Sequence, residues 1–403
     1  MKKRLFCISI LVLLVGISGC SPEIMSSKCD KKSDIFKLPI VSPESQGFDS
    51  KKLCELDYLI ADLVDSASIP GACLIVGRNG YIVKAGAYGW QELEPQKIPM
   101  TIDTLFDLAS VTKPIGPGSA ILKLLDQNKI SLDDPVSKYI PEFAEEGKPV
   151  VTVRDLATHT SSLPAGINIW KLNEELGPEP NPVETLKAMC RTPLRGKPGK
   201  KYIYSDINYT LLARVAEVAC GMNLETYLKK EVYEPLDMFN TGVRLTDEQK
   251  AKCAPTSGAG EFIRGYVHDP TARFYCTKDY TPGNAGLFST VSDLANYGSM
   301  IANGGLWKGK RILSERAIEL MTTPQTKTAD RSIGWGAWKG DNGHNYISHL
   351  GWTGTYMIVD VDTGSFMVYL TNRTHTHNDG FYRIINSGKM VDLWSESLLP
   401  TSE

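Results

Sequence analysis

Strand-like segments lie near both ends of this 403-residue chain, and they restrict its possible folds more than any other feature. Residues 71–77 are apolar and partly β-branched, and the Asn-Gly turn signal at Asn79 separates them from a returning segment, 81–86. Three later segments alternate like consecutive antiparallel strands: 346–350, 355–361 and 365–370. We therefore expect antiparallel pairing near both ends of the chain.

Helical patterns occupy other parts of the chain. Apolar residues recur at close to helical period in 51–66, and helical runs are expected at 119–125, 152–156 and 211–219. The Gly116-Pro117-Gly118 interruption should kink or restart the helix that begins near Ser110. A further short helix is expected after 132–135. With 42% hydrophobic residues, the chain can bury a core of two domains, or of one large domain with an insertion.

The first nineteen residues have the pattern of a signal peptide. Lys2, Lys3 and Arg4 precede an apolar run, and small residues then lead into Cys20. This order resembles the bacterial lipoprotein box, in which the cysteine becomes the lipidated first residue of the mature protein. We expect 1–19 to be removed, Cys20 to carry lipid and 20–42 to form a tether, which places the protein in a bacterial cell envelope, on its periplasmic or outer-surface face. The alternative is a simple secretory signal with an incidental Cys20.

Charge and cysteine content exclude some functions and leave others open. Removing the signal peptide leaves 41 Lys and Arg against 46 Asp and Glu, a net charge of −5 with no basic patch, so we expect no nucleic-acid partner. Beyond Cys7 and Cys20, seven scattered cysteines remain, from which no disulfide pairing can be deduced. The pair His375 and His377 lacks acidic or thiol partners at familiar spacing, and we expect no metal site.

The first candidate for chemistry is the pair Ser110 and Lys113. On a helix these positions are neighbours, so the lysine amine can take the serine proton if the site lowers its pKa. A serine with a base beside it is a nucleophile. The free backbone N–H groups of a helix start would favour developing negative charge, and Pro114 fits the first turn because its missing N–H costs no hydrogen bond there.

The second candidate stretch contains Tyr204 and Asp206, at an expected junction of loop and helix. A tyrosine near a cationic lysine can pass a proton to a leaving group, and the aspartate can hydrogen-bond substrate from the same turn. An ordinary packing role for Tyr204 is the alternative.

The third candidate stretch is His349, Gly351 and Trp352, in the strand-rich end of the chain. A glycine two residues after a strand histidine leaves backbone open to an extended substrate. The Trp352 N–H could supply a second oxyanion donor opposite that of Ser110.

Together these stretches resemble a known family. Ser110-Val111-Thr112-Lys113, Tyr204-Ser205-Asp206 and His349-Leu350-Gly351 are similar to the three motifs of penicillin-recognising serine enzymes. Their order and spacing resemble the class C β-lactamase-related branch of the serine β-lactamase-like and penicillin-binding-protein-like superfamily. That branch includes β-lactamases, D-alanyl-D-alanine carboxypeptidases, D-aminopeptidases and serine esterases. The likeness covers residues 43–395 and includes four connecting stretches: 132–136, 158–161, 235–238 and 283–290.

The resemblance implies one catalytic domain with an α/β (α+β) fold. An antiparallel sheet flanked by helices would be built from both chain ends, at 43–104 and 287–398. A mostly helical region, 105–286, would be inserted between them, with the site in the cleft.

Two motif positions depart from the family pattern. Relatives that hydrolyse β-lactams usually carry asparagine where Asp206 stands, and lysine where His349 stands. An ionised aspartate cannot donate a hydrogen bond as asparagine does, and a histidine is often uncharged near neutral pH. Both changes should weaken recognition of a carboxylated lactam, so we expect a neutral substrate, with His349 as a hydrogen-bonding partner.

The sequence thus predicts a lipid-anchored serine hydrolase that forms an acyl-enzyme at Ser110 on ester or amide substrates, of the esterase or D-amino-acid peptidase type. Lys113 would take the serine proton, Tyr204 would pass a proton to the leaving group, and no cofactor would be needed. Its partners would be a small-molecule or cell-wall-peptide substrate and the membrane. Alternatives are an acyltransferase to an alcohol acceptor, a β-lactamase or D-alanyl-D-alanine carboxypeptidase, and a non-catalytic cell-wall binding module.

Overall fold

The computed structural model describes residues 35–144, 148–258, 261–375 and 387–399. The expected signal peptide, Cys20 and most of the expected tether lie outside these residues, and so does His377. Within the described ranges, no helix is both long enough and apolar enough to cross a membrane. The six cysteines in these ranges (54, 73, 190, 220, 253 and 276) form no disulfide with one another.

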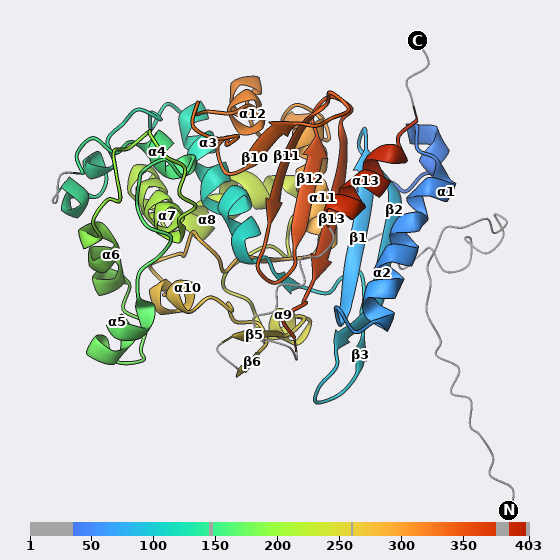
Figure 1. Ribbon diagram of the computed structural model, residues 1–403, viewed down its shortest axis with the longest axis horizontal. Coiled ribbons are helices and arrows are strands. Elements are labelled where there is room, and N and C mark those ends of the chain that lie inside the picture. Colours follow the sequence, from blue (N-terminus) through green and yellow to red (C-terminus); the bar gives the residue numbers. More distant parts are fainter. Residues whose placement is uncertain (1–34, 145–147, 259–260, 376–386, 400–403) are drawn as a thin grey trace, which may run out of the picture.

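A seven-stranded antiparallel sheet forms one half of the molecule (Figure 1), in the order β10-β11-β12-β13-β1-β2-β3. Its strands are β1 (Gly71–Arg78), β2 (Tyr81–Glu92), β3 (Ile98–Pro99), β10 (Gly336–Lys339), β11 (Asn345–Leu350), β12 (Tyr356–Asp360) and β13 (Ser365–Thr371). The expected strands at both chain ends are confirmed, and β13 pairs directly with β1. Asn79 and Gly80 both have positive φ, which gives the β1–β2 turn the twist of a tight hairpin.

Helices cover both faces of this sheet because its central strands are apolar on both faces. Leu74 and Val76 of β1 pack in one core with α1 (Ser50–Leu53), α2 (Glu55–Asp65) and α13 (Ser387–Glu396). The alternate residues Cys73 and Ile75 pack in the main core, where α11 (Val291–Ala302) contacts β1 and β13. The helix expected over 51–66 is therefore present, but it is broken at Cys54.

The chain between the two parts of the sheet is mostly helical, as expected, and it forms the other half of the molecule (Figure 1). Its α-helices are α3 (Ser119–Asp126), α4 (Val153–Ala157), α5 (Ile169–Leu176), α6 (Pro182–Arg191), α7 (Asp206–Cys220), α8 (Leu224–Leu228), α9 (Asp247–Ala251) and α10 (Pro270–Tyr275). Its other helical turns include η5 (Val136–Lys138), η6 (Pro141–Ala144), η7 (Lys229–Tyr233) and η8 (Glu234–Leu236). Helix α12 (Glu315–Thr322) and the turn η2 (Pro43–Gln46) lie outside this region.

Three short two-stranded sheets complete the secondary structure. Strand β4 (Phe106–Asp107) pairs with β7 (Phe288–Ser289), so the two ends of the helical region lie together. The other short strands are β5 (Thr256–Gly258), β6 (Glu261–Ile263), β8 (Leu306–Trp307) and β9 (Lys310–Arg311).

The segment after β4 is helical from Ala109 to Asp126, but its geometry changes along its length. A 3-10 turn, η3 (Ala109–Val111), precedes a π-helical turn, η4 (Pro114–Gly118), which runs into α3. The Gly-Pro-Gly interruption is thus absorbed by a π turn in place of the expected kink or restart. Such turns accommodate a residue that cannot donate its backbone N–H, as Pro117 cannot.

Two other expected helix starts gave different outcomes. Thr152 and Asp155 form a capping box at the start of α4, which confirms the helix expected there. The stretch 132–135 leads only into the 3-10 turn η5, without a side-chain cap. Asp134 instead accepts hydrogen bonds from the Ser131 N–H, Lys138 and Tyr139.

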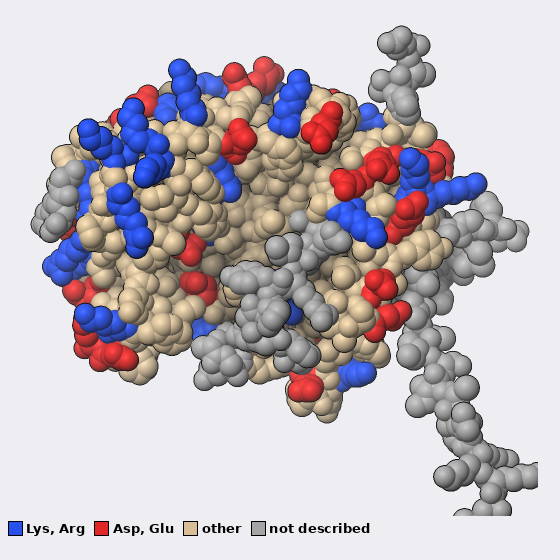
Figure 2. All heavy atoms as spheres, in the orientation of Figure 1, with Lys and Arg blue, Asp and Glu red and all other residues tan. Residues whose placement is uncertain are grey.

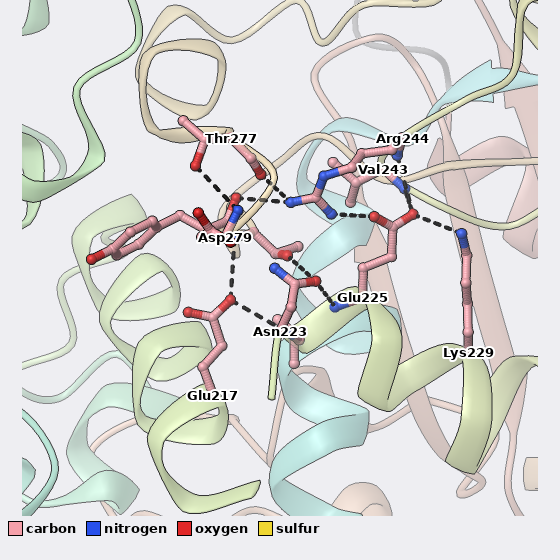
Figure 3. A network of polar contacts seen from close by, with 11 residues as sticks. Glu217, Asn223, Glu225, Lys229, Val243, Arg244, Thr277 and Asp279 are labelled. Atoms are coloured by element: carbon pink, nitrogen blue, oxygen red, sulfur yellow. Dashed lines mark hydrogen bonds and ion pairs between the residues drawn. The ribbon is translucent and has the colours of Figure 1, made fainter. Parts of the chain in front are cut away.

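A polar network behind the site joins α7, α8 and the loop before β7 (Figure 3). Glu225 accepts hydrogen bonds from the N–H groups of Val243 and Arg244 at 2.9 and 3.1 Å, and pairs with the Arg244 guanidinium. Glu217 accepts from the Thr281 N–H at 3.2 Å. Thr281 lies three residues before Asn284, whose carbonyl oxygen accepts a hydrogen bond from Lys113. The network therefore fixes the loop that contacts this lysine.

Candidate active site

Ser110 and Lys113 lie side by side at the start of the helical segment that becomes α3. Lys113 Nζ donates to Ser110 Oγ at 3.0 Å and to the carbonyl oxygen of Asn284 at 2.8 Å. The lysine side chain is completely buried. The i, i+3 spacing predicted from the sequence is thereby confirmed as a direct contact.

The turn that presents Ser110 has an unusual backbone. Ala109 has φ +47°, in the left-handed region that costs an L-residue other than glycine about 1–2 kcal/mol. The Asp107 carboxylate, two residues earlier, accepts the Ala109 N–H at 2.9 Å. Strain of this kind persists only where surrounding contacts hold it, and it places Ser110 at the end of a sharply bent turn.

The loop between β11 and β12 is bonded to this same turn. The hydroxyls of Thr353 and Thr355 donate to the carbonyl oxygens of Asp107 and Leu108 at 2.7 and 2.8 Å. A Cβ on Gly351 would lie 2.5 Å from the Leu108 oxygen and 2.1 Å from Thr355 Oγ1. The missing side chain of this glycine therefore makes room for the nucleophile's turn, and the expected contact of its backbone with an extended substrate stays a prediction.

Charge at the site centres on an ion pair between Lys113 and Asp206, the first residue of α7. Their Nζ and Oδ1 atoms are 2.7 Å apart, and 39% of the aspartate side chain is exposed. Burial alone would lower the pKa of Lys113, but the negative charge of Asp206, aided by Tyr204, outweighs burial and raises it. The lowered lysine pKa that the sequence argument required is thus wrong for the resting site, where Lys113 is a cation.

Tyr204 lies at the loop-to-helix junction expected from the sequence, and its ring is surrounded by two cations and two histidine rings. The centre of its ring is 4.9 Å from Lys113 Nζ and 4.5 Å from the ring of His159. The Arg331 guanidinium carbon lies 5.9 Å from the same ring, and the ring of His349 lies 6.3 Å away. The structure therefore brings all three predicted motifs together around one tyrosine.

His349, on β11, is buried and uncharged. Its pKa is held well below the usual histidine value by burial, with further lowering by Arg331 and Lys113. Nδ1 lies 2.9 Å from the Leu350 carbonyl oxygen, so we assign the hydrogen to Nδ1 and the lone pair to Nε2. Nε2 is buried without a partner among the described residues, which leaves one acceptor for a substrate hydrogen.

Trp352 follows β11 on the loop that packs against the nucleophile's turn. Its side chain is partly exposed, and its carbonyl oxygen accepts from Arg373 Nε at 2.8 Å. The role of the Trp352 N–H as an oxyanion donor stays a prediction.

Three residues of the site were missed as site residues in the sequence argument. Asn284 and His159 lie in stretches that carried the family resemblance, but no role followed from it. His159 has φ +58°, and its Nδ1 accepts the Ser205 N–H at 3.0 Å, which supports the loop that carries Tyr204. Arg331 lies in a loop without any recognisable pattern, so no sequence signal could have found it.

A cavity of about 460 Å³ opens next to the loop that carries Tyr204. It lies between α5 and α6, with Leu172 and Leu194 among its apolar walls and Lys171 and Arg195 as cations. None of the catalytic candidates lines it, but Pro164, in its wall, accepts a hydrogen bond from Ser205 at 2.6 Å. Figure 2 shows a separate hollow between the helical region and the sheet, with few charges on its visible walls.

Among the described residues, no three His, Cys, Asp or Glu side chains are grouped so that they could hold a metal ion. The side chains gathered at this site offer the chemistry of a serine, a buried cation, a tyrosine and neutral histidines.

Comparison with known proteins agrees with this geometry. The family model described as "Beta-lactamase" matches residues 56–388. An Escherichia coli O157:H7 protein, provisionally named a D-alanyl-D-alanine carboxypeptidase, is 28% identical over 93% of this chain and 92% of its own length. The N-acetylmuramyl-L-alanine amidase of Bacillus subtilis is 30% identical over 85% of this chain and 86% of its own.

Solved structures show the same fold. A class C beta-lactamase superposes with a TM-score of 0.70 at 22% identity, covering 88% of this chain and 98% of its own. A penicillin-binding protein homologue from Pyrococcus abyssi gives a TM-score of 0.67 at 24% identity, covering 86% and 79%. With the family model covering most of the chain and the Ser-x-x-Lys pair in contact, this chain belongs to the beta-lactamase family of serine hydrolases.

Proposed function

We propose that this enzyme forms an acyl-enzyme at Ser110 and hydrolyses amide or ester substrates that carry a carboxylate close to the scissile bond, as a D-amino-acid peptide does. The names of two relatives, a carboxypeptidase and a cell-wall amidase, support a cell-wall-peptide substrate. The observation that carries the proposal is Arg331.

Arg331 supplies a positive charge at the site, which His349 cannot do because its imidazole is neutral. Its guanidinium stacks 5.2 Å from the ring of Tyr202 and 5.9 Å from that of Tyr204, and no carboxylate pairs with it in the described part of the chain. Lys113 and Asp206 neutralise each other, and His349 is neutral, so one positive charge remains beside Tyr204. This charge favours an anionic substrate over the neutral substrate expected from the motifs alone.

Ser110 would be activated only when substrate covers the site. Lys113 is buried and Asp206 is partly exposed, so a bound substrate removes water chiefly from the aspartate. An ion pair deprived of water shifts towards its neutral form, in which the Lys113 proton passes to Asp206. The neutral amine then takes the Ser110 proton as Oγ attacks the carbonyl carbon.

The remaining steps use groups already in place. Backbone N–H groups at Ser110 and Trp352 would hold the oxyanion, and Tyr204 would pass a proton to the leaving amine or alcohol. Water then attacks the acyl carbon and releases Ser110. The cavity beside Ser205 would give room to a distant part of a longer substrate.

The substrate proposal is tested by a matched pair of peptides, one ending in D-alanyl-D-alanine and one in its C-terminal amide, run beside a p-nitrophenyl ester and a cephalosporin. Arg331→Gln should lower kcat/KM for the free-acid peptide about 10- to 100-fold, equivalent to about 1.4–2.8 kcal/mol, and leave the amide and the ester little changed. Arg264→Gln is the control, because Arg264 also lies over an aromatic ring, that of Phe262, but pairs with Glu92. Equal losses on both peptides, or a parent that prefers the neutral ester, would reject the carboxylate.

We also propose that the enzyme is lipid-anchored through Cys20 in the cell envelope, on the support of the lipoprotein-like order of residues 2–20. Cys20→Ala should release the protein from membranes or block its maturation. Unchanged membrane association in that variant would rule the anchor out.

A further inference from the structure

Asp107 joins the nucleophile's turn to a histidine outside the three motifs. The carboxylate is buried, and its Oδ1 accepts the Ala109 N–H at 2.9 Å. Its Oδ2 accepts the His268 N–H at 2.8 Å and lies 2.8 Å from His268 Nδ1. One carboxylate therefore holds a strained alanine on one side and a histidine on the other.

The position of Ser110 depends on this carboxylate. Ala109, with φ +47°, immediately precedes Ser110, so a change in that dihedral angle would swing Oγ away from Lys113. A misplacement of about 1 Å can cost about a hundredfold in rate. Any group that fixes Asp107 thus acts on the nucleophile without touching substrate.

His268 is surrounded by carboxylates. Asp107 of β4, Asp269 at the N-cap of α10 and Asp206 of α7 all face it, and the Arg273 guanidinium contacts its carbonyl oxygen at 3.4 Å. Burial lowers the pKa of His268, but these carboxylates, Asp107 first, outweigh burial and raise it above the usual value. The ring therefore stays protonated to a higher pH than a free histidine, and its bond to Asp107 is charge-assisted.

We propose that His268 is a positioning residue: by pairing with Asp107, it holds the Ala109 turn in the conformation that presents Ser110 to Lys113. The inference rests on the proposed function only in that Ser110 is the reacting group. Because the histidine pKa is raised, its charged contribution is complete below about pH 6.5 and is lost as the pH rises through the raised value.

Two substitutions separate the hydrogen bond from the charge. Among the described residues, only Nδ1 of the His268 ring makes a hydrogen bond. Asparagine places its amide nitrogen near that position, so His268→Asn keeps the bond without the charge, whereas His268→Ala loses both. The matched controls are His344→Asn and His344→Ala, because His344 Nδ1 also lies 2.8 Å from a buried aspartate, Asp360, at the β11–β12 end of the sheet.

The readout is the rate at which a fluorescent serine-directed phosphonate labels Ser110, measured against pH in the full chain, with thermal unfolding measured in parallel. We expect His268→Ala to label about 10- to 100-fold more slowly than the parent. His268→Asn should recover most of the rate, and its rate relative to the parent should rise as the pH increases above about 6.5. The His344 variants should label at the parent rate.

Each outcome bears on a different claim. Parent-like labelling by His268→Ala, or a ratio of His268→Asn to parent that does not change with pH, overturns the positioning role. If His268→Ala does not fold, the pH dependence of His268→Asn alone decides. A parent that is not labelled overturns the proposed function and this inference together, whereas a labelled parent that hydrolyses no substrate overturns only the former.

Discussion

The ion pair between Lys113 and Asp206 gives the sharpest prediction, through the substitution Asp206→Asn. The charges are 2.7 Å apart, and two unit charges at that distance in an effective dielectric near 20 attract by about 6 kcal/mol. The aspartate side chain is 39% exposed, so solvent screening removes much of that attraction, and exposed pairs retain only about 1 kcal/mol or less. Because Lys113 is completely buried, this pair lies between those two limits, and a remaining effect of about 1.4–2.8 kcal/mol corresponds to one or two pKa units.

Removing the carboxylate should lower the pKa of Lys113, because burial lowers this pKa and the negative charge of Asp206 would no longer raise it. The neutral amine would appear at lower pH, so the acid-side limb of kcat/KM for a p-nitrophenyl ester should move to lower pH by about one to two units. The pH dependence of kcat/KM in the free enzyme measures this directly.

The matched control is Asp237→Asn, which removes a carboxylate paired with Lys308 at 2.8 Å outside the site. It should leave the limb in place. An acid limb that stays fixed in Asp206→Asn, or moves to higher pH, would refute the claim that Asp206 holds Lys113 in its charged form.

Three further predictions follow from the site. Intact-mass measurement after treatment with a mechanism-based acylating agent should show one adduct, which disappears in Ser110→Ala; an adduct that persists would place the nucleophile elsewhere. His349→Lys should improve cephalosporin turnover relative to ester turnover, because the parent imidazole is neutral and a lysine adds charge, and the absence of any relative gain would contradict this. Gly351→Ala should destabilise the fold by about 1–3 kcal/mol in denaturant unfolding and slow acylation, since the new Cβ overlaps the Leu108 oxygen; parent-like stability would show that the turn can move.

Local patterns predicted five of the seven strands of the sheet and singled out the motif residues, but they did not predict the short strands β3 and β10. The Asn79 turn and the alternating C-terminal segments gave the strands, and the Ser110–Lys113 spacing gave a real contact. Local patterns could not predict the charge on Lys113, because the carboxylate that stabilises this charge belongs to Asp206, 93 residues later in the sequence. Arg331 and His268 were missed for the same reason: a single cation or histidine in a loop has no periodicity, and only tertiary packing brings it to the site.

The pairing of β1 with β13 has a consequence for the synthesis of the chain. Strand β1 ends at residue 78 and its partner begins at residue 365, so at about 5–20 residues per second β13 follows roughly 15–60 s later. The Thr353 and Thr355 bonds to the nucleophile's turn also join distant parts of the chain, 246 and 247 residues apart. During that interval one edge of β1 is open to pairing with other chains, and no growing chain yet has its serine in place. A nascent chain of this hydrolase is therefore inactive until its last strands are made.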